Sequence, residues 1–197
     1  MKKVTQLGIT FNEKLTDDHI DTRINKAMTG IHALKRLSNI LPRSGKRSVY
    51  LSFIRPILEY GNQLYDNCSE TLSKRLEKVQ REAALCITRA YRCTKHNNLL
   101  AEVGLTTLKE RRRRQKLLFI YKCLNNLAPD YLASVITTRK LPIQHETRHP
   151  NDLLPYNSNK CYLYNSFIVS SIREWNLEKK TLEGFSIVKH FQKSLTS

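Results

Sequence analysis

The pentapeptide HETRH, from His145 to His149, is the segment of this chain that suggests metal chemistry most directly. It matches the HExxH pattern, in which two histidines one helical turn apart bind zinc and the glutamate acts as a general base. Pro142 precedes the segment, and Pro150 disfavours helical geometry at His149. We therefore favour a chance match, with a zinc enzyme as the disfavoured alternative.

Two further groups of residues carry reactive side chains without a suitable arrangement. Cys86, Cys93 and His96 have a spacing that fits no closed four-ligand zinc site, so we favour core thiols. Asp17 and Asp18 suggest the paired carboxylates of a two-metal polymerase or nuclease. Successive helical residues point about 100° apart, however, and aspartates in a first turn stabilise the helix dipole. We favour this capping role, and the sequence shows no complete active site.

The charge of the chain indicates a polyanionic partner. The 197 residues include 34 Lys and Arg against 17 Asp and Glu, a net charge of +17. This excess is larger than solubility requires, and it implicates nucleic acid or an anionic surface. With 40% hydrophobic residues, the chain can also bury a core, so it is not a disordered basic tail.

Segments for membrane insertion or secretion are not evident. The longest apolar run, Leu117 to Tyr121, is too short to cross a bilayer, and the amino end lacks the apolar core of a signal peptide. We expect an intracellular protein, in the nucleus or the cytoplasm, without membrane contact. The five cysteines are odd in number and widely spaced, so we expect reduced thiols and no disulfide.

The pattern of apolar residues predicts a mainly α fold. Leu7, Ile9 and Phe11 alternate with polar residues as in a strand, and a turn at 12–14 follows. Spacings of three and four then predict a first helix from a cap at Thr16 to a break at Pro42, Ser44 and Gly45. Its apolar stripe consists of Ile20, Ile24, Ala27, Ile31 and Leu34.

The second and third helices are predicted on either side of residue 61. The second carries Val49, Leu51, Phe53 and Ile54 and is expected to kink at Arg55, because a proline disfavours helical geometry in the residue before it. In the third, an apolar face lies opposite a basic stripe of Lys74, Lys78 and Arg81. The apolar face consists of Leu72, Leu76, Val79, Ala83 and Ile87.

Further helices are predicted at 99–105, closed by Gly104, from Thr106 or Thr107 to 127, at 131–136 after Pro129, at 166–175 and at 185–195. The prolines and polar residues of 137–165 indicate a linker. The expected organisation is a strand remnant at 1–15, a helical domain at 16–136, this linker and a helical segment at 166–197. The fold class is therefore a mainly α helical bundle, with a short amino-terminal strand or hairpin and a helical carboxy-terminal appendage.

Four consecutive arginines, Arg111, Arg112, Arg113 and Arg114, lie within the basic run that ends at Lys116. On a helix they sweep about 300° of the circumference, so we expect this turn to bury no side and to project into solvent or against an anion. Phosphate contact is the favoured role. A solvated helix end and a nuclear import signal are the alternatives.

Taken in order, several segments resemble the carboxy-terminal part of the reverse transcriptase of non-LTR (LINE-type, jockey-like) retrotransposons. The resemblance covers about Val4 to Lys193. It is carried by LGITFNEKLTDDHI, INKAMTGIHALKRL, FIRPILEYGNQLYD, LEKVQREAALCITRAY, LLAEVGLTTLKERRRRQKLLFIYK and SFIVSSIREWN.

The resemblance implies that Leu7, Gly8 and Ile9 correspond to the primer-grip strand at the edge of the palm. It also implies that 20–91 is the thumb, which holds template and primer. The catalytic palm, with its aromatic-x-Asp-Asp turn, is absent from this sequence. The parent polymerase would use magnesium, whereas we expect this chain to need no cofactor and not to be an enzyme on its own. Gln6 replaces the usual aromatic residue, which suggests a decayed copy.

The sequence thus predicts a truncated RNA-directed DNA polymerase fragment that binds the phosphate backbone of RNA or DNA without reading sequence. The alternatives are a non-functional relic and an interaction module, whose orphan strand edge at 7–11 docks onto the missing palm or another protein. The expected binding residues are Lys74, Lys78, Arg81, Arg111, Arg112, Arg113, Arg114 and Lys116.

Overall fold

The computed structural model describes residues 4–11, 17–66, 68–137, 152–154 and 161–182. This part of the chain is mainly α-helical, as the sequence predicts. The chain divides into two compact units, 1–111 and 112–197. The division falls inside one helix, α7 (Leu108–Leu124), whereas the sequence placed a linker at 137–165. Each unit has a hydrophobic core of its own, which is why they separate there.

A two-stranded antiparallel hairpin stands at the amino end. Its strands are β1 (Val4–Gln6) and β2 (Ile9–Phe11), with Gln6 opposite Ile9. Leu7 and Gly8 form the connecting turn, with φ values of 50° and 71°. The strand predicted over 7–11 is therefore wrong in its first two residues, because a two-residue hairpin turn requires left-handed backbone that alternation of side chains does not reveal. The turn predicted at 12–14 lies outside the described residues.

The first helix, α1 (Asp17–Arg36), buries the stripe predicted from the sequence. All five stripe residues, Ile20 to Leu34, are buried in the core of the first unit. Thr16, the predicted cap, lies outside the described residues, as do the side chains of Asp17 and Asp18. The backbone of Asp17 and Asp18 does open α1, the position that capping requires.

The second predicted helix is continuous from residue 43 to residue 59 and consists of α2 (Arg43–Val49), a π-helical turn η1 (Tyr50–Ile54) and α3 (Arg55–Glu59). Of the residues predicted to separate this helix from the first one, Pro42 is the N-cap of α2, and Ser44 and Gly45 lie in its first turn. The kink expected at Arg55 is also wrong, since Arg55 keeps helical angles of −60° and −43°. The wider π turn just before Pro56 accommodates a proline that has no N–H and crowds the preceding turn.

This continuous rod packs against α1 through Tyr50, Ile54 and Leu58, which are all buried. Phe53, predicted to be among the apolar residues of the helix, instead has 70% of its surface exposed. The side chain of Ile54 reaches to 3.2 Å from the point that a β-carbon on Gly30 would occupy. Gly30 thus permits the close approach of α1 and the rod.

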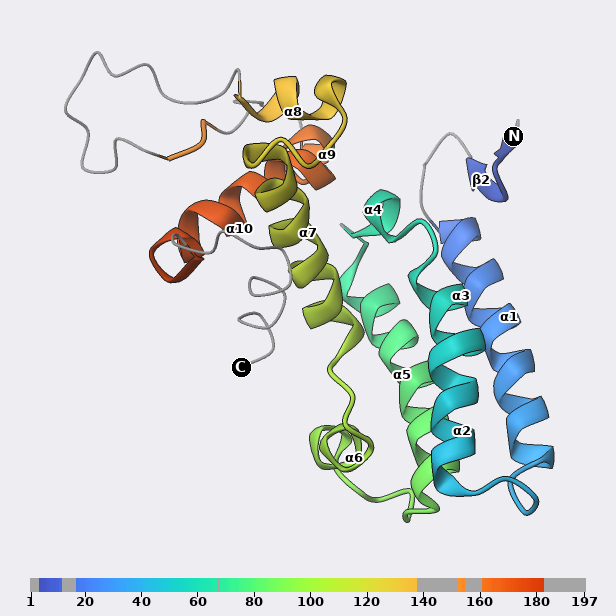
Figure 1. The fold of residues 1–197 in the computed structure, drawn as a ribbon. Helices are drawn as coiled ribbons and strands as arrows, with labels where there is room; N and C mark the ends of the chain where they lie inside the picture. Colours follow the sequence, from blue (N-terminus) through green and yellow to red (C-terminus); the bar gives the residue numbers. More distant parts are fainter. Residues whose placement is uncertain (1–3, 12–16, 67, 138–151, 155–160, 183–197) are drawn as a thin grey trace. The chain divides into compact units, whose positions relative to one another are not determined.

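Beyond Gly61 and the short α4 (Asn62–Tyr65), α5 (Glu70–Thr88) lies beside α1 and α2 (Figure 1). Ser69 caps α5, because its hydroxyl accepts a hydrogen bond from the Leu72 amide at 3.3 Å. The predicted apolar face from Leu72 to Ile87 is confirmed, since its five residues are buried. The next helix, α6 (His96–Val103), ends at Gly104 with φ of 70°, which confirms the predicted closing glycine.

A buried lysine joins α2 to the end of α5. Lys46 is 2% exposed, and its ammonium donates a hydrogen bond to the carbonyl oxygen of Cys86 at 3.1 Å. Carbonyls in the last turn of a helix carry partial negative charge, so this cation stabilises the carboxy-terminal end of α5. The thiol of Cys86 is itself buried, and burial raises its pKa, so it is an unreactive core residue.

In the second unit, α7 is accompanied by α8 (Asp130–Thr137), α9 (Cys161–Tyr164) and α10 (Phe167–Leu182). Asn176 on α10 holds the chain at Leu153 through two hydrogen bonds of 2.8 and 3.0 Å. Helix α9 lies within the segment predicted as a linker, and the helix predicted at 185–195 lies outside the described residues. The core of this unit includes Leu117, Ile120, Tyr121, Cys123, Ile136, Leu153, Ile172 and Trp175.

Two glycines of the first unit should respond in opposite directions to alanine. Gly104→Ala should lower the free energy of unfolding by about 1–2 kcal/mol, because φ of 70° strains a residue with a β-carbon. Gly45→Ala should raise it by about 0.5–1 kcal/mol, since Gly45 is helical and its nearest neighbour across the new β-carbon is 3.4 Å away. Denaturant unfolding followed by circular dichroism measures both, and changes of the same sign would contradict the two conformations.

Candidate nucleic-acid interface

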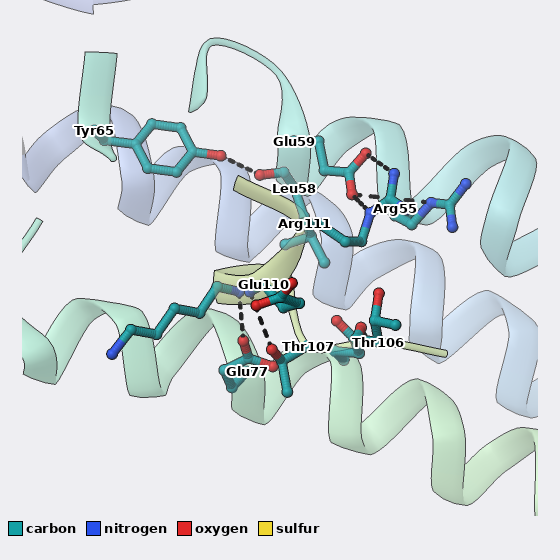
Figure 2. A network of polar contacts seen from close by, with 11 residues as sticks. Arg55, Leu58, Glu59, Tyr65, Glu77, Thr106, Thr107, Glu110 and Arg111 are labelled. Carbon is teal, nitrogen blue, oxygen red and sulfur yellow. Dashed lines mark hydrogen bonds and ion pairs between the residues drawn. The ribbon is translucent and has the colours of Figure 1, made fainter. Parts of the chain in front are cut away.

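The first arginine of the predicted cluster, Arg111, is held by a carboxylate. Its guanidinium donates two hydrogen bonds to Glu59, one of them 3.1 Å long, and Arg55 Nε lies 4.0 Å from the same carboxylate (Figure 2). The hydrogen bonds that Arg111 donates to Glu59 raise the pKa of Arg111, whereas burial, reinforced by the Arg111 charge, lowers the pKa of Arg55. Arg111 therefore serves to join α7 to α3 within the first unit.

The start of α7 is tied down by polar contacts with α5. The hydroxyl of Thr107 accepts from the Glu110 amide at 3.1 Å, so Thr107 is the cap, one of the two predicted starts of this helix. Glu77 accepts from the Lys109 amide at 3.0 Å, and Gln80 donates to the Thr106 carbonyl at 2.8 Å. A carboxylate at the start of α7 offsets the dipole that the following arginines oppose.

The remaining cations of the cluster belong to the second unit, where two of them are buried. Arg112 and Lys116 are each 7% exposed, and the ammonium of Lys116 lies 2.6 Å from the carboxylate of Glu174. Arg113 forms an ion pair with Glu178, while Arg114 is half-buried. The expectation that this turn buries no side is therefore wrong, because α10 brings two carboxylates alongside α7.

The basic stripe on α5 lies at the surface, in contrast to the arginine cluster. Lys78 is exposed and forms no ion pair among the described residues, and Lys74 lies 3.8 Å from Glu70 in an exposed pair. Such surface pairs contribute little free energy, so both ammonium groups remain available to an anion. Arg81 is half-buried, and its guanidinium donates to the carbonyl oxygens of Arg92 and Thr94.

These bonds from Arg81 bring two further exposed cations, Arg92 and Lys95, next to the α5 stripe. The sequence analysis missed both, although the run YRCTK beyond the predicted helix is a basic signal. We call the combined surface the basic ridge, which consists of Lys74, Lys78, Arg81, Arg92 and Lys95.

Other cations of the first unit join its helices. Arg75 pairs with Asp21 at 2.8 Å and Arg43 with Glu102 at 3.0 Å. Lys35 pairs with Glu82 at 2.7 Å, and this hydrogen bond lowers the pKa of Glu82. These ion pairs connect helices that are distant in sequence. We therefore assign Arg75, Arg43 and Lys35 to the stability of the fold and not to the candidate interface.

The primer-grip-like residues lie against α1 and the end of α3. Arg23 donates to the carbonyl oxygen of Gly8 at 2.7 Å, and its guanidinium stacks 4.3 Å from the centre of the Tyr60 ring. The Tyr60 hydroxyl donates to the Leu7 carbonyl, and Ile9 lies close to Gly61. The turn is thus docked through its backbone, while the Leu7 side chain is exposed.

The candidate metal ligands do not converge. Among the described residues, no group of three or more His, Cys, Asp and Glu side chains is placed to hold a metal ion. Cys86 is buried and Cys93 exposed, so the core position predicted for both thiols holds only for the first. His145 and His149 lie outside the described residues.

No helix in the described ranges is both long and apolar enough to span a bilayer. Comparisons of the chain with protein-family models, with curated proteins and with solved structures find no match.

The Arg111 ion pair predicts a stability effect. Arg111→Gln should lower the free energy of unfolding by about 1–3 kcal/mol, because it leaves a partly buried Glu59 carboxylate with a single, more distant cation. The matched variant Lys78→Gln removes an exposed charge and should change stability by less than about 0.5 kcal/mol. Denaturant unfolding compares the two, and equal stabilities would contradict the assignment of Arg111 to the fold.

His19 predicts a pH dependence. Burial, together with the Arg23 charge, lowers its pKa in the folded protein, so the unfolded chain binds the proton more readily. The stability from neutral His19 should be complete above about pH 6.5 and should fall as the pH drops below that value. His19→Gln should flatten this fall, whereas His32→Gln, at an exposed position of the same helix, should leave it unchanged. Unfolding midpoints between about pH 5 and 8 test this, and identical profiles for both variants would refute it.

Proposed function

We propose that this chain is the thumb-like carboxy-terminal part of a non-LTR retrotransposon reverse transcriptase, and that it binds the phosphate backbone of RNA or DNA through the basic ridge. The ordered set of resembling segments and the net charge of +17 support the origin and the partner. The function proposed is binding alone, without polymerisation of nucleotides.

One observation carries the choice of surface: Lys74 and Lys78 are exposed on α5, whereas three cations of the arginine cluster, Arg111, Arg113 and Lys116, are held by acidic residues. An exposed ammonium with no more than a weak partner can contact a phosphate without breaking an internal bond. Arg111 or Lys116 would first have to leave a carboxylate, which costs the free energy of that pair.

The chemistry of the ridge suits a backbone and not a base sequence. Lys74 and Lys78 are four residues apart, so their side chains project from the same face of α5, about 6 Å apart along its axis. Ammonium groups at the ends of flexible side chains contact phosphate as point charges and release bound counterions. Binding should therefore be strongly salt-dependent and similar for unrelated sequences.

If the five cations of the ridge neutralise five phosphates on a single strand, log affinity against log salt should have a slope of about −3.5. Lys74→Gln with Lys78→Gln should make this slope shallower by about 1.4 and weaken binding to unrelated sequences equally. Fluorescence anisotropy with labelled oligonucleotides provides the measurement.

The matched control is Lys26→Gln with Lys122→Gln, which removes the same charge from positions outside the ridge. This control should leave the slope close to that of the unchanged chain. A flat salt response of the unchanged chain would refute the proposed function, and equal effects of the two pairs of substitutions would refute the ridge.

A further inference from the structure

The segment between α5 and α6 exposes an aromatic ring next to Arg92, one of the residues of the basic ridge. Tyr91 has 85% of its surface exposed, the largest fraction among the exposed aromatic residues of the described ranges. An aromatic side chain buries a large apolar area when it finds a partner, so such exposure leaves a considerable binding surface uncovered. Neither the fold nor the phosphate contacts proposed above use this ring.

The backbone on both sides of Tyr91 is held by the rest of the first unit. Arg89, with φ of 57°, donates to the carbonyl oxygen of Ser38 at 2.7 Å. The Thr94 amide donates to the Tyr91 carbonyl at 3.0 Å, and Arg81 on α5 donates to the carbonyl oxygens of Arg92 and Thr94. The turn is therefore fixed on one side to the loop after α1 and on the other to α5.

This fixation matters for binding because a fixed backbone loses little conformational entropy when a ligand docks. A tyrosine ring also has only two rotatable side-chain bonds, so it offers contact area at a low entropic cost. The contacts of Arg89 and Arg81 thus hold an aromatic platform in place without covering it.

The neighbours of Tyr91 identify the ligand chemistry. Arg92 and Lys95 are exposed on the same segment, so an aromatic face and phosphate-binding cations lie within a few residues of each other. Proteins that bind single strands combine cations along the backbone with aromatic rings on which bases stack. In a duplex the bases are stacked on one another, and the ring could reach them only at an end.

We infer that Tyr91 stacks on a base of a single-stranded nucleic acid, while Arg92 and Lys95 contact its phosphates. This inference rests on the proposed function and specifies its substrate class as single-stranded RNA or DNA. Stacking requires only the flat face of a base, so it adds affinity for unpaired strands without selecting a sequence.

The test compares Tyr91→Ala with the unchanged full-length chain on four labelled ligands at low salt. These are a single-stranded DNA and a single-stranded RNA of roughly 12 nucleotides, a DNA of equal length without bases, and a duplex of equal length. Tyr91→Ala should weaken binding to both single strands by about five- to 150-fold and leave the abasic strand and the duplex within about twofold. Tyr91→Phe, which keeps the ring, should bind like the unchanged chain.

The matched control is Tyr131→Ala, which removes another highly exposed tyrosine, on α8. It should leave all four affinities unchanged. If Tyr91→Ala loses affinity for only one of the two single strands, the stacking role stands and that strand, RNA or DNA, is the ligand of the ring. If the single strands bind with salt dependence but Tyr91→Ala has no effect, the stacking role is overturned and the proposed function stands. If none of the four ligands binds, both are overturned.

Discussion

The structure depends on how 17 acidic residues are shared among 34 basic ones. Where a cation is buried or partly buried, an acceptor must accompany it, because an unpaired buried charge is costly. For Lys46 and Arg81 the acceptors are backbone carbonyls, whereas other cations have carboxylates. Glu59 neutralises Arg111 in the first unit, and Glu174 and Glu178 neutralise Lys116 and Arg113 in the second. Acidic residues that pair with these cations cannot also neutralise the lysines and arginines at the surface. The excess of positive charge therefore remains exposed.

This distribution of acids separates two kinds of basic residue that look alike in the sequence. Arg111 and Arg113 form ion pairs that stabilise the fold, whereas Lys78 and Arg92 are exposed. Arg81 combines the two roles. Its guanidinium fixes the turn at 92–94, and this brings the cations of that turn next to those of α5. A basic surface is thus assembled by hydrogen bonds to backbone carbonyls as much as by the exposed charges themselves.

The same turn carries the surface that we propose for stacking. Its backbone is held by bonds from Arg89 and Arg81, while the ring of Tyr91 is left in solvent. An exposed aromatic ring beside exposed cations suits ligands that are themselves extended and repetitive, since each repeat contributes a small and similar free energy.

The sequence by itself determined the elements that depend on local pattern. Spacings of three and four identified the buried faces of α1 and α5, and Thr107 and Gly104 marked a helix start and a helix end, because caps and amphipathic stripes are properties of neighbouring residues. The same reasoning identified Lys74 and Lys78 as a basic stripe on one face of a helix.

Only the tertiary structure decided which charges are internal. Nothing near Arg111 or Lys116 in sequence indicates that Glu59 and Glu174 will lie beside them, 52 and 58 residues away along the chain. The π turn before Pro56 and the left-handed turn at Leu7 were likewise missed, since both depend on packing and on backbone angles that residue type alone does not specify. Ion pairs, close approaches and exposure are relations between distant segments, and they exist only once the chain has folded.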